Sequence, residues 1–405
     1  MASERSVGEV HGDVEEGFGA VADAFRSNLV DRNEVGAACA VHCEGRAVVD
    51  IWGGFRDAAR TLPWERDTLV PVFSTTKGMA SIAMAVAHSR GLFDLDDRVV
   101  DHWPEFGQCG KDSVTVRQLL SHQAGLAAVD TPLTLELLAD PDALGEILGA
   151  QPPAWVPGTF HGYHGQSLGW YESQLLRRCD PTGRTIGRYF ADEVARPLGI
   201  EFYIGLPDDV GDERLATFLG GRMASAILHL HEMPPRLVLA LLNPFGLTGR
   251  VFRNPKALLK ASDINRRDIL RIELPSVNGT GTARAIAKAY GVVATGGAEL
   301  RMSAGTIREI EAVPKPPSGG AHDKVLKTET AYGFGFMKPF PMLPFGSSAR
   351  AFGHTGTGGS FGYADPDRAL GYAYVMNRVD FAVPTSSREL ALRAAVEGAI
   401  ASTIG

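Results

Sequence analysis

The sequence predicts a mixed α/β fold, of the α+β type, in which helices flank an antiparallel sheet built from both ends of the chain. Two observations support this. Short apolar segments separated by turn residues occur near residues 36–73 and again near residues 351–377, and a helical pattern flanks each group. The stretch between the two groups is rich in helical and loop patterns. We therefore expect a sheet domain of residues 1–91 and 281–405, with an inserted, mostly helical domain of residues 92–280.

Composition and charge restrict the classes of partner. The 405 residues are 44% hydrophobic and 21% charged, far from the profile of a disordered chain. The 40 Lys and Arg residues against 47 Asp and Glu residues give a formal net charge of -7, and no basic run is present that could follow a phosphate backbone. We expect no nucleic-acid partner.

The chain carries no pattern typical of export or of a membrane span. Residues 1–13 are polar and acidic, unlike a signal peptide, and apolar runs such as residues 237–242 are far shorter than the roughly 20 residues that cross a bilayer. Of the four cysteines, Cys39 and Cys43 would lie roughly 13 Å apart on a strand, beyond disulfide reach. These features predict a cytoplasmic protein with reduced thiols and no membrane partner.

The N-terminal part is expected to form a helix and then a hairpin. Apolar residues recur every three or four positions in residues 13–32, the pattern of a helix that packs one face on a sheet. Residues 36–43 and 46–52 are rich in Val and Ala and are separated by Glu44-Gly45. This spacing predicts a β-hairpin.

A strand-to-helix junction is expected at Ser74. Residues 67–73 form a short apolar run that leads directly into residues 74–90, a helical stretch rich in Ala and Met that stops at Gly91. The first helical turn therefore begins at Ser74.

The inserted region shows helix signals separated by long loops. Thr115 and Gln118 form a capping box, and Gly125 is expected to end the helix that follows. A second helix is expected over residues 185–197, ended by its proline. Residues 205–275 mix Pro, Gly, Arg and apolar residues without a clean period, which indicates helices and loops that face a cleft.

The C-terminal part returns to strands. Residues 282–294 have the pattern of a helix, and residues 351–354, 360–365 and 371–377 are short apolar or aromatic segments with turn residues between them. A last helix is expected over residues 386–400. Both ends of the chain thus have the composition of a sheet covered by helices.

Ser74 and Lys77 are the candidate nucleophile and base. The hydroxyl lies in the first turn of the expected helix, and the amine three residues later falls on the same face. A Ser hydroxyl needs a neighbouring group that accepts its proton, and a Lys enclosed among apolar residues can have a lowered pKa. The helix N-terminus adds free backbone N–H groups that favour negative charge. Since Ser-x-x-Lys also occurs by chance on many helices, the junction is the feature that favours a catalytic role.

The sequence resembles the serine β-lactamase and penicillin-recognising superfamily, specifically the class C-like carboxylesterases called family VIII. The resemblance covers nearly the whole chain and implies a β-lactamase-like fold. It rests on several ordered motifs: Ser74-Thr-Thr-Lys77, Gln118-Leu-Leu-Ser-His-Gln-Ala-Gly-Leu126, Pro157-Gly-Thr-Phe-His-Gly-Tyr-His164, Arg196-Pro-Leu-Gly199, and Gly353-His-Thr-Gly356 followed by a Gly-rich strand.

The resemblance implies further site residues. Tyr163 would supply a phenol paired with Lys77, first as part of the general base for Ser74 and later as an acid toward the leaving group. The run His354-Thr355-Gly356 would line the cleft on an edge strand, where lactamases carry Lys-Thr-Gly. The backbone N–H groups of Ser74 and Thr357 would form the oxyanion hole.

Two departures from the lactamase pattern favour esters over β-lactams. The family's Tyr-x-Asn reads Tyr163-His164-Gly165 here, which loses an amide that contacts β-lactams, and His354 replaces the Lys that meets their carboxylate. The resemblance therefore implies a serine carboxylesterase that cleaves short-chain or small-molecule esters through an acyl-enzyme intermediate.

Other functions remain open at this point. The same site could serve an acyltransferase, a weak β-lactamase or a D-amino-acid peptidase, and the fold could also serve a non-catalytic ligand-binding homologue. Tyr163 could be a packed loop aromatic, and His354 a strand histidine bonded to the backbone.

A rival nucleophile is offered by two Gly-x-Ser-x-Gly runs, centred on Ser167 and Ser360, which match the nucleophile elbow of α/β-hydrolases. An elbow needs a buried strand before the serine and a helix after it. A loop pattern precedes Ser167, whereas Ser360 opens an expected strand, so neither context fits.

No metal or cofactor is expected. The run His229-Leu-His231-Glu232 lacks the spacing of two ligands on one helix face, and no phosphate-binding Gly-rich loop opens a helix. The expected partner is a small-molecule ester, and the sequence carries no indication of oligomeric state.

Overall fold

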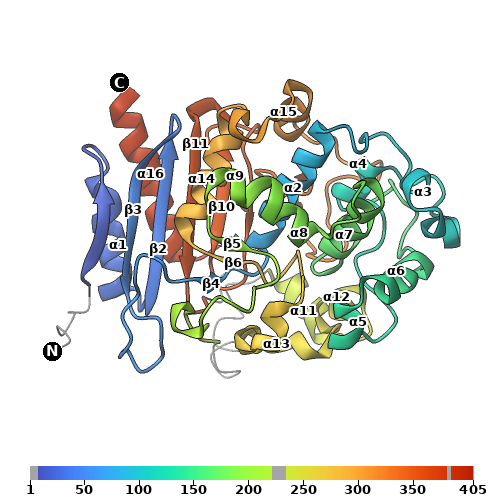
Figure 1. Ribbon diagram of the computed structural model, residues 1–405, viewed down its shortest axis with the longest axis horizontal. Helices are drawn as coiled ribbons and strands as arrows, with labels where there is room; N and C mark the ends of the chain where they lie inside the picture. The colour runs from blue at the N-terminus through green and yellow to red at the C-terminus, as the bar shows by residue number, and fades with distance from the viewer. Residues whose placement is uncertain (1–7, 221–233, 381–384, 405) are drawn as a thin grey trace.

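The computed structural model describes residues 8–220, 234–380 and 385–404. It confirms a mixed α/β fold with a large antiparallel sheet, which occupies one side of the molecule while short helices occupy the other (Figure 1). In this eight-stranded sheet the three N-terminal strands lie together at one side, and five strands from the C-terminal part complete it. In spatial order they are β1 (Val10–Val14), β3 (Arg46–Gly54), β2 (Gly36–Cys43), β11 (Leu370–Met376), β10 (Phe361–Asp365), β9 (Phe352–Thr355), β8 (Phe336–Met337) and β7 (Tyr332–Gly333).

The hairpin of β2 and β3 is confirmed. Its turn residues, Glu44 and Gly45, have φ angles of 50° and 78°, the left-handed pair that a two-residue turn of type I′ requires. Cys39 lies opposite Ile51 in the register, and all four cysteines of the chain are free thiols, as expected.

The N-terminal helix begins later than the sequence indicated. Helix α1 covers Gly19–Asp31, whereas the expected helix started at residue 13. The residues before it form the edge strand β1, which pairs with β3. Gly12 explains why the pattern was missed: a Cβ there would lie 2.0 Å from the carbonyl oxygen of Asp50, so the close pairing depends on a residue that disfavours strands.

Helices cover both faces of the sheet, and strand β11 shows how. Successive residues of a strand point to opposite faces. A Cβ at Gly371 would lie 2.2 Å from the backbone of Gly291 in helix α14 (Ala283–Ala294), while the next residue, Tyr372, faces the charged groups of helix α16 (Ser387–Ile404). Strand β11 is consequently buried along its whole length. The expected strands near residues 351–377 and both of these helices are confirmed.

The middle of the chain forms short helices and a small sheet. The helices are α3 (Val99–His102), α4 (Val116–Leu120), α5 (Leu135–Ala139), α6 (Pro141–Ala150), α7 (Ser167–Cys179), α8 (Ile186–Phe190), α9 (Arg196–Leu198), α11 (Pro235–Leu242), α12 (Leu247–Arg253), α13 (Arg267–Arg271) and α15 (Ala304–Glu311). Strands β4 (Val70–Pro71), β6 (Thr280–Gly281) and β5 (Phe202–Tyr203) form a second sheet. The division into domains at residues 91/92 and 280/281 stays a prediction.

One expected helix end in this region is wrong. The Thr115 and Gln118 capping box is present, but helix α4 ends at Leu120, before Gly125. The helical stretch after Thr185 continues from α8 through a π-helical turn, Ala191–Ala195, into α9 and ends at Leu198, one residue after the expected end at Pro197. The chain leaves α9 at Gly199, whose φ of 59° makes it the C-cap.

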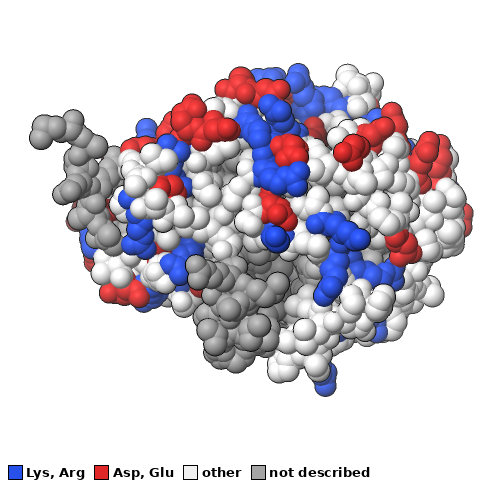
Figure 2. Space-filling model, turned by 90° about the horizontal axis from the view of Figure 1, so that it is seen from below, with Lys and Arg blue, Asp and Glu red and all other residues white. Residues whose placement is uncertain are grey.

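In the part of the chain that the structure describes, no helix combines the length and apolar character needed to cross a bilayer. On the face seen in Figure 2, Lys and Arg side chains lie among Asp and Glu side chains and do not form one continuous basic band.

A buried ion pair ties the two chain ends together. Arg388 of α16 donates from Nη1 to Glu34 Oε1 at 2.7 Å, and their side chains are 4% and 0% exposed. Tyr374 of β11 also donates its hydroxyl hydrogen to Glu34. The Glu34 carboxyl group therefore joins helix α16, strand β11 and the start of β2. Burial raises the pKa of Glu34, and this effect outweighs the opposing effect of the nearby Arg388.

We expect Arg388→Ala to lower the free energy of unfolding by about 3–5 kcal/mol, because it leaves the Glu34 carboxylate buried without its cationic partner. The matched control is Arg26→Ala, which breaks the exposed pair with Asp23 and should leave stability unchanged within error. Urea titration of the three proteins measures both effects. An equally small loss in both variants would contradict a structural role for the buried pair.

Candidate active site

Ser74 sits where strand β4 meets helix α2. The helix covers Thr75–Ser89 and has Ser74 as its N-cap residue, in agreement with the expected junction. Its buried face is rich in Ala and Met, which favour a helix and pack closely. Phe73, directly before the serine, has a φ of 48°, a conformation that non-glycine residues adopt at a cost. The chain therefore turns sharply at this point and presents Ser74, half-buried, at the end of a buried helix.

The structure brings together the three residues that the sequence placed in one site. Lys77 Nζ lies 3.1 Å from Ser74 Oγ, and the Tyr163 hydroxyl donates a hydrogen bond of 2.8 Å to the same oxygen. Lys77 Nζ also lies 4.8 Å from the centre of the Tyr163 ring. One hydroxyl oxygen is thus in contact with both an amine and a phenol.

Lys77 is fully buried and held by two backbone carbonyls. Its Nζ donates to the Gly165 oxygen at 2.7 Å and to the Ser276 oxygen at 3.0 Å. With two N–H groups directed to these oxygens, a neutral amine has its lone pair left for Ser74. Burial lowers the pKa of Lys77 to about 7, against a smaller opposing effect of Glu172. Close to neutral pH, a large fraction of this lysine is therefore the free amine that can accept a proton.

Tyr163 is positioned by its backbone as well as its ring. Its N–H lies 3.1 Å and 3.0 Å from the two carboxylate oxygens of the buried Asp323. Asp323 Oδ1 also accepts from the N–H groups of Val325 and Leu326. Burial raises the pKa of the Tyr163 phenol further above its ordinary value, so the phenol stays protonated. The chain thus offers a neutral proton donor beside a neutral proton acceptor.

The sequence did not identify Asp323 or the two carbonyls. Asp323 lies in a loop without a regular pattern, and its partner is a backbone N–H 160 residues away. Backbone oxygens carry no side-chain signal at all. Only the fold shows that these groups converge on Tyr163 and Lys77.

The end of strand β9 packs against the chain around Ser74. A Cβ at Gly356 would lie 2.2 Å from the Val72 oxygen, so a glycine is needed there. Ser360 Oγ donates a hydrogen bond of 2.9 Å to the Val72 oxygen, which stabilises the packing of this segment on Val72. The backbone N–H groups of Ser74 and Thr357 make no hydrogen bond within the described residues, which leaves both donors free at this junction.

His354 is a buried, neutral strand residue. Its Nδ1 lies 2.7 Å from the Thr355 oxygen, and its Nε2 has no hydrogen-bond partner among the described residues. Burial, together with the nearby Lys77, lowers the pKa of His354 to about 3. The ring centre is 5.9 Å from that of Tyr163. His354 is therefore uncharged close to neutral pH and gives the site no cation.

Neither rival serine has the setting of a nucleophile. Ser167 is 1% exposed and donates its hydroxyl hydrogen to the Leu126 oxygen at 2.7 Å, and a loop precedes it. Ser360 is 2% exposed, and its hydroxyl is held by Val72 and Thr75. Both side chains support backbone packing, so the nucleophile-elbow alternative is not favoured.

Within residues 8–220, 234–380 and 385–404, no three His, Cys, Asp or Glu side chains cluster in a way that could hold a metal ion. The run His229-Leu-His231-Glu232 lies outside the described residues.

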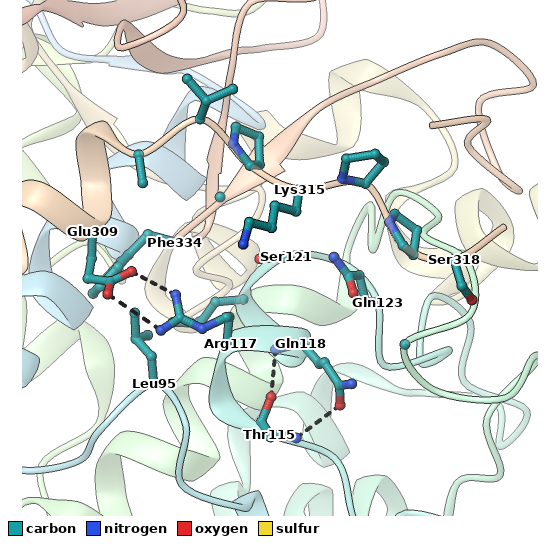
Figure 3. A pocket seen from close by; sticks show the side chains of 18 residues that line it. Leu95, Thr115, Arg117, Gln118, Ser121, Gln123, Glu309, Lys315, Ser318 and Phe334 are labelled. Atoms are coloured by element: carbon teal, nitrogen blue, oxygen red, sulfur yellow. Dashed lines mark hydrogen bonds and ion pairs between the residues drawn. The ribbon is translucent and has the colours of Figure 1, made fainter. Parts of the chain in front are cut away.

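A separate cavity of about 600 Å³ lies between helix α4 and residues 312–318. Its wall includes the ion pair of Arg117 with Glu309, and Lys315 reaches over it (Figure 3). None of Ser74, Lys77 or Tyr163 lines this cavity, so it is distinct from the site at Ser74.

Comparison with known proteins agrees with this fold. A family model described as Beta-lactamase matches residues 21–397. The protein named Esterase/beta-lactamase LipL of Mycobacterium tuberculosis is 32% identical over 91% of this chain and 83% of its own length.

Two solved structures resemble the whole chain. A crystal structure of a family VIII carboxylesterase is 37% identical, with a TM-score of 0.82, over 96% of this chain and 100% of its own. The structure of EstA from Arthrobacter nitroguajacolicus Rue61a is 33% identical, with a TM-score of 0.83, over 97% of this chain and 99% of its own.

Proposed function

The chain belongs to the beta-lactamase family, as a serine hydrolase of that fold, and we propose that it is a carboxylesterase acting on short-chain or small-molecule esters through an acyl-enzyme intermediate. One observation carries the proposal: Ser74 Oγ lies within hydrogen-bond distance of both Lys77 Nζ and the Tyr163 hydroxyl. The names of the relatives, a family VIII carboxylesterase and an esterase/beta-lactamase, support the same reaction class.

In the proposed acylation step, Ser74 Oγ attacks the ester carbonyl carbon and its proton passes to Lys77 Nζ. The lysine is the suitable acceptor because burial lowers its pKa to about 7, whereas the Tyr163 phenol holds its proton. Since the active form of Lys77 is the free amine, its fraction, and the rate with it, should rise with pH through about 7. The tetrahedral oxyanion would be held by the unoccupied N–H groups of Ser74 and Thr357.

The leaving alkoxide then needs a proton. The Tyr163 hydroxyl is hydrogen-bonded to Ser74 Oγ and its ring lies beside Lys77 Nζ, so Tyr163 can give its phenol proton to the alkoxide and regain one from the Lys77 ammonium. The C–O bond to the alcohol breaks and the acyl group remains on Ser74. Water, activated by the same pair, releases the acid and restores the hydroxyl.

The neutral His354 favours esters over β-lactams. A β-lactam carries a carboxylate that a cation would bind, and the low pKa of His354 leaves it uncharged at neutral pH. Gly165, two residues after Tyr163, has no side-chain amide to offer and instead gives its carbonyl oxygen to Lys77. An ester needs neither contact.

Ser74→Ala should abolish hydrolysis of a short-chain p-nitrophenyl ester while the circular dichroism spectrum stays native, because the attacking oxygen is removed from a site that otherwise keeps its hydrogen bonds. The matched control is Ser167→Ala, which should keep turnover, since Ser167 only bonds the Leu126 carbonyl. Turnover in the first variant with loss in the second would transfer the nucleophile to Ser167.

We expect a chromogenic cephalosporin to be cleaved with a kcat/KM about 10- to 100-fold below that of the ester. The reason is that the neutral His354 forms no charge-assisted hydrogen bond with the cephalosporin carboxylate. Steady-state kinetics with both substrates on one enzyme preparation gives the ratio. A cephalosporin cleaved faster than the ester would overturn the substrate class.

A further inference from the structure

Residues 205–275, which the sequence indicates as helices and loops that face a cleft, place one aromatic side chain beside the site. Phe252 lies near the end of helix α12, and its ring centre is 6.5 Å from that of Tyr163. A Cβ at Gly165 would lie 3.2 Å from Phe252 Cε1, closer than an ordinary contact, so the Phe252 ring packs against the Gly165 backbone. The carbonyl oxygen of Gly165 is one of the two that hold Lys77. Phe252 therefore borders both groups that handle the proton in the proposed reaction.

Phe252 is the ring neighbour of Tyr163 that a ligand can reach. Among the described residues, four rings lie near that of Tyr163, with centres 5.6, 5.9, 6.2 and 6.5 Å away: His122, His354, Tyr332 and Phe252. The first three side chains are buried, whereas Phe252 is half-buried. Apolar surface that stays accessible beside a reacting group is where an apolar part of a substrate packs.

Helix α12 holds Phe252 in a fixed position. Near the start of the helix, Thr248 Oγ1 donates a hydrogen bond of 2.7 Å to the Val325 oxygen. Directly after its end, Asn254 Nδ2 donates a hydrogen bond of 2.9 Å to the Val129 oxygen. The backbone that carries Phe252 is thus bonded to distant segments on both sides. A side chain supported in this way can fix the orientation of a ligand.

We propose that Phe252 determines specificity for the alcohol part of the ester, and that the preferred substrates are esters of apolar, above all aromatic, alcohols. The inference rests on the proposed serine-hydrolase reaction. In that reaction the bond between the acyl carbon and the alcohol oxygen breaks, and the alkoxide takes the phenol proton of Tyr163. The alcohol part must lie next to Tyr163 when this proton is transferred, which places it against the accessible ring of Phe252, while the acyl part stays on Ser74.

The test compares benzyl acetate with ethyl acetate. Their alcohols have similar acidity, so the ratio of the two kcat/KM values reports contact with the alcohol part and not the quality of the leaving group. Wild type should prefer the benzyl ester, and Phe252→Ala should lower this preference by about 3- to 10-fold, the range that one lost contact between aromatic rings represents. Equal cleavage of both esters by wild type, or a variant with the wild-type ratio, would overturn the proposal.

A second pair of esters locates the contact. Ethyl acetate and ethyl butyrate differ only in the acyl part, so Phe252→Ala should leave the ratio of their kcat/KM values unchanged. A variant that changes this acyl ratio and keeps the alcohol ratio of wild type would place Phe252 on the acyl side and would contradict the assignment.

The matched control is Phe245→Ala, which removes a ring that is 89% exposed in the turn between α11 and α12. Both ratios should stay at their wild-type values in this control. An equal loss of benzyl preference in both variants would assign the effect to the helix pair as a whole and would refute a contact with Phe252. Should Phe252→Ala not fold, Phe252→Leu takes its place, with a smaller loss of benzyl preference expected because an apolar side chain remains.

A labelling experiment separates this proposal from the proposed function. A fluorophosphonate reacts with an activated Ser74 without ester turnover, and benzyl alcohol bound beside Tyr163 should slow that reaction more than ethanol does. Phe252→Ala should remove the difference between the two alcohols. If wild type is labelled but cleaves no ester, the proposed function fails, and the protection by benzyl alcohol still tests Phe252. Equal protection by both alcohols in wild type would contradict the proposal.

Discussion

The proposed chemistry depends on the burial of one amine. Lys77 lies in the first turn of α2 and is fully buried, and two of its N–H groups are donated to the carbonyl oxygens of Gly165 and Ser276. These contacts direct the lone pair of the neutral amine toward Ser74. Burial lowers the pKa of Lys77 to about 7. A surface lysine would be charged at neutral pH and would hold no lone pair for the serine.

The groups that surround Lys77 come from distant parts of the chain. Helix α2 provides the serine and the lysine, the loop before α7 provides Tyr163 and the Gly165 carbonyl, and the turn after α13 provides the Ser276 carbonyl. Strand β9 contributes His354, and the turn after β9 contributes the free N–H of Thr357. The large sheet matters here because it sets strands from the C-terminal part beside those from the N-terminal part, which brings β9 against α2. The buried pair of Glu34 and Arg388 helps hold that closure from the opposite face.

Much of this arrangement could be predicted from the sequence, because several of its features depend on residues that are adjacent in the chain. The Glu44-Gly45 turn, the junction at Ser74 and the capping box at Thr115 each follow from a few adjacent residues. The ordered motifs then placed Tyr163 and the strand of His354 in one site. Edge strand β1 was missed, since its pairing with β3 outweighs the low strand propensity of Gly12. Asp323 could not be found either, because its role arises only from a contact across the fold, with the backbone N–H of Tyr163.

The proposed reaction requires Lys77 to be an uncharged amine close to neutral pH. The most direct measurement is a ¹³C NMR titration of the lysine Cε signals in protein labelled with ¹³C-lysine, with Lys77→Met identifying the signal of this residue. We expect a midpoint at about 7 for that signal, because burial lowers the pKa of Lys77. A midpoint near the ordinary lysine value of 10.5 would contradict it, because the lysine would then be charged whenever the serine must be activated.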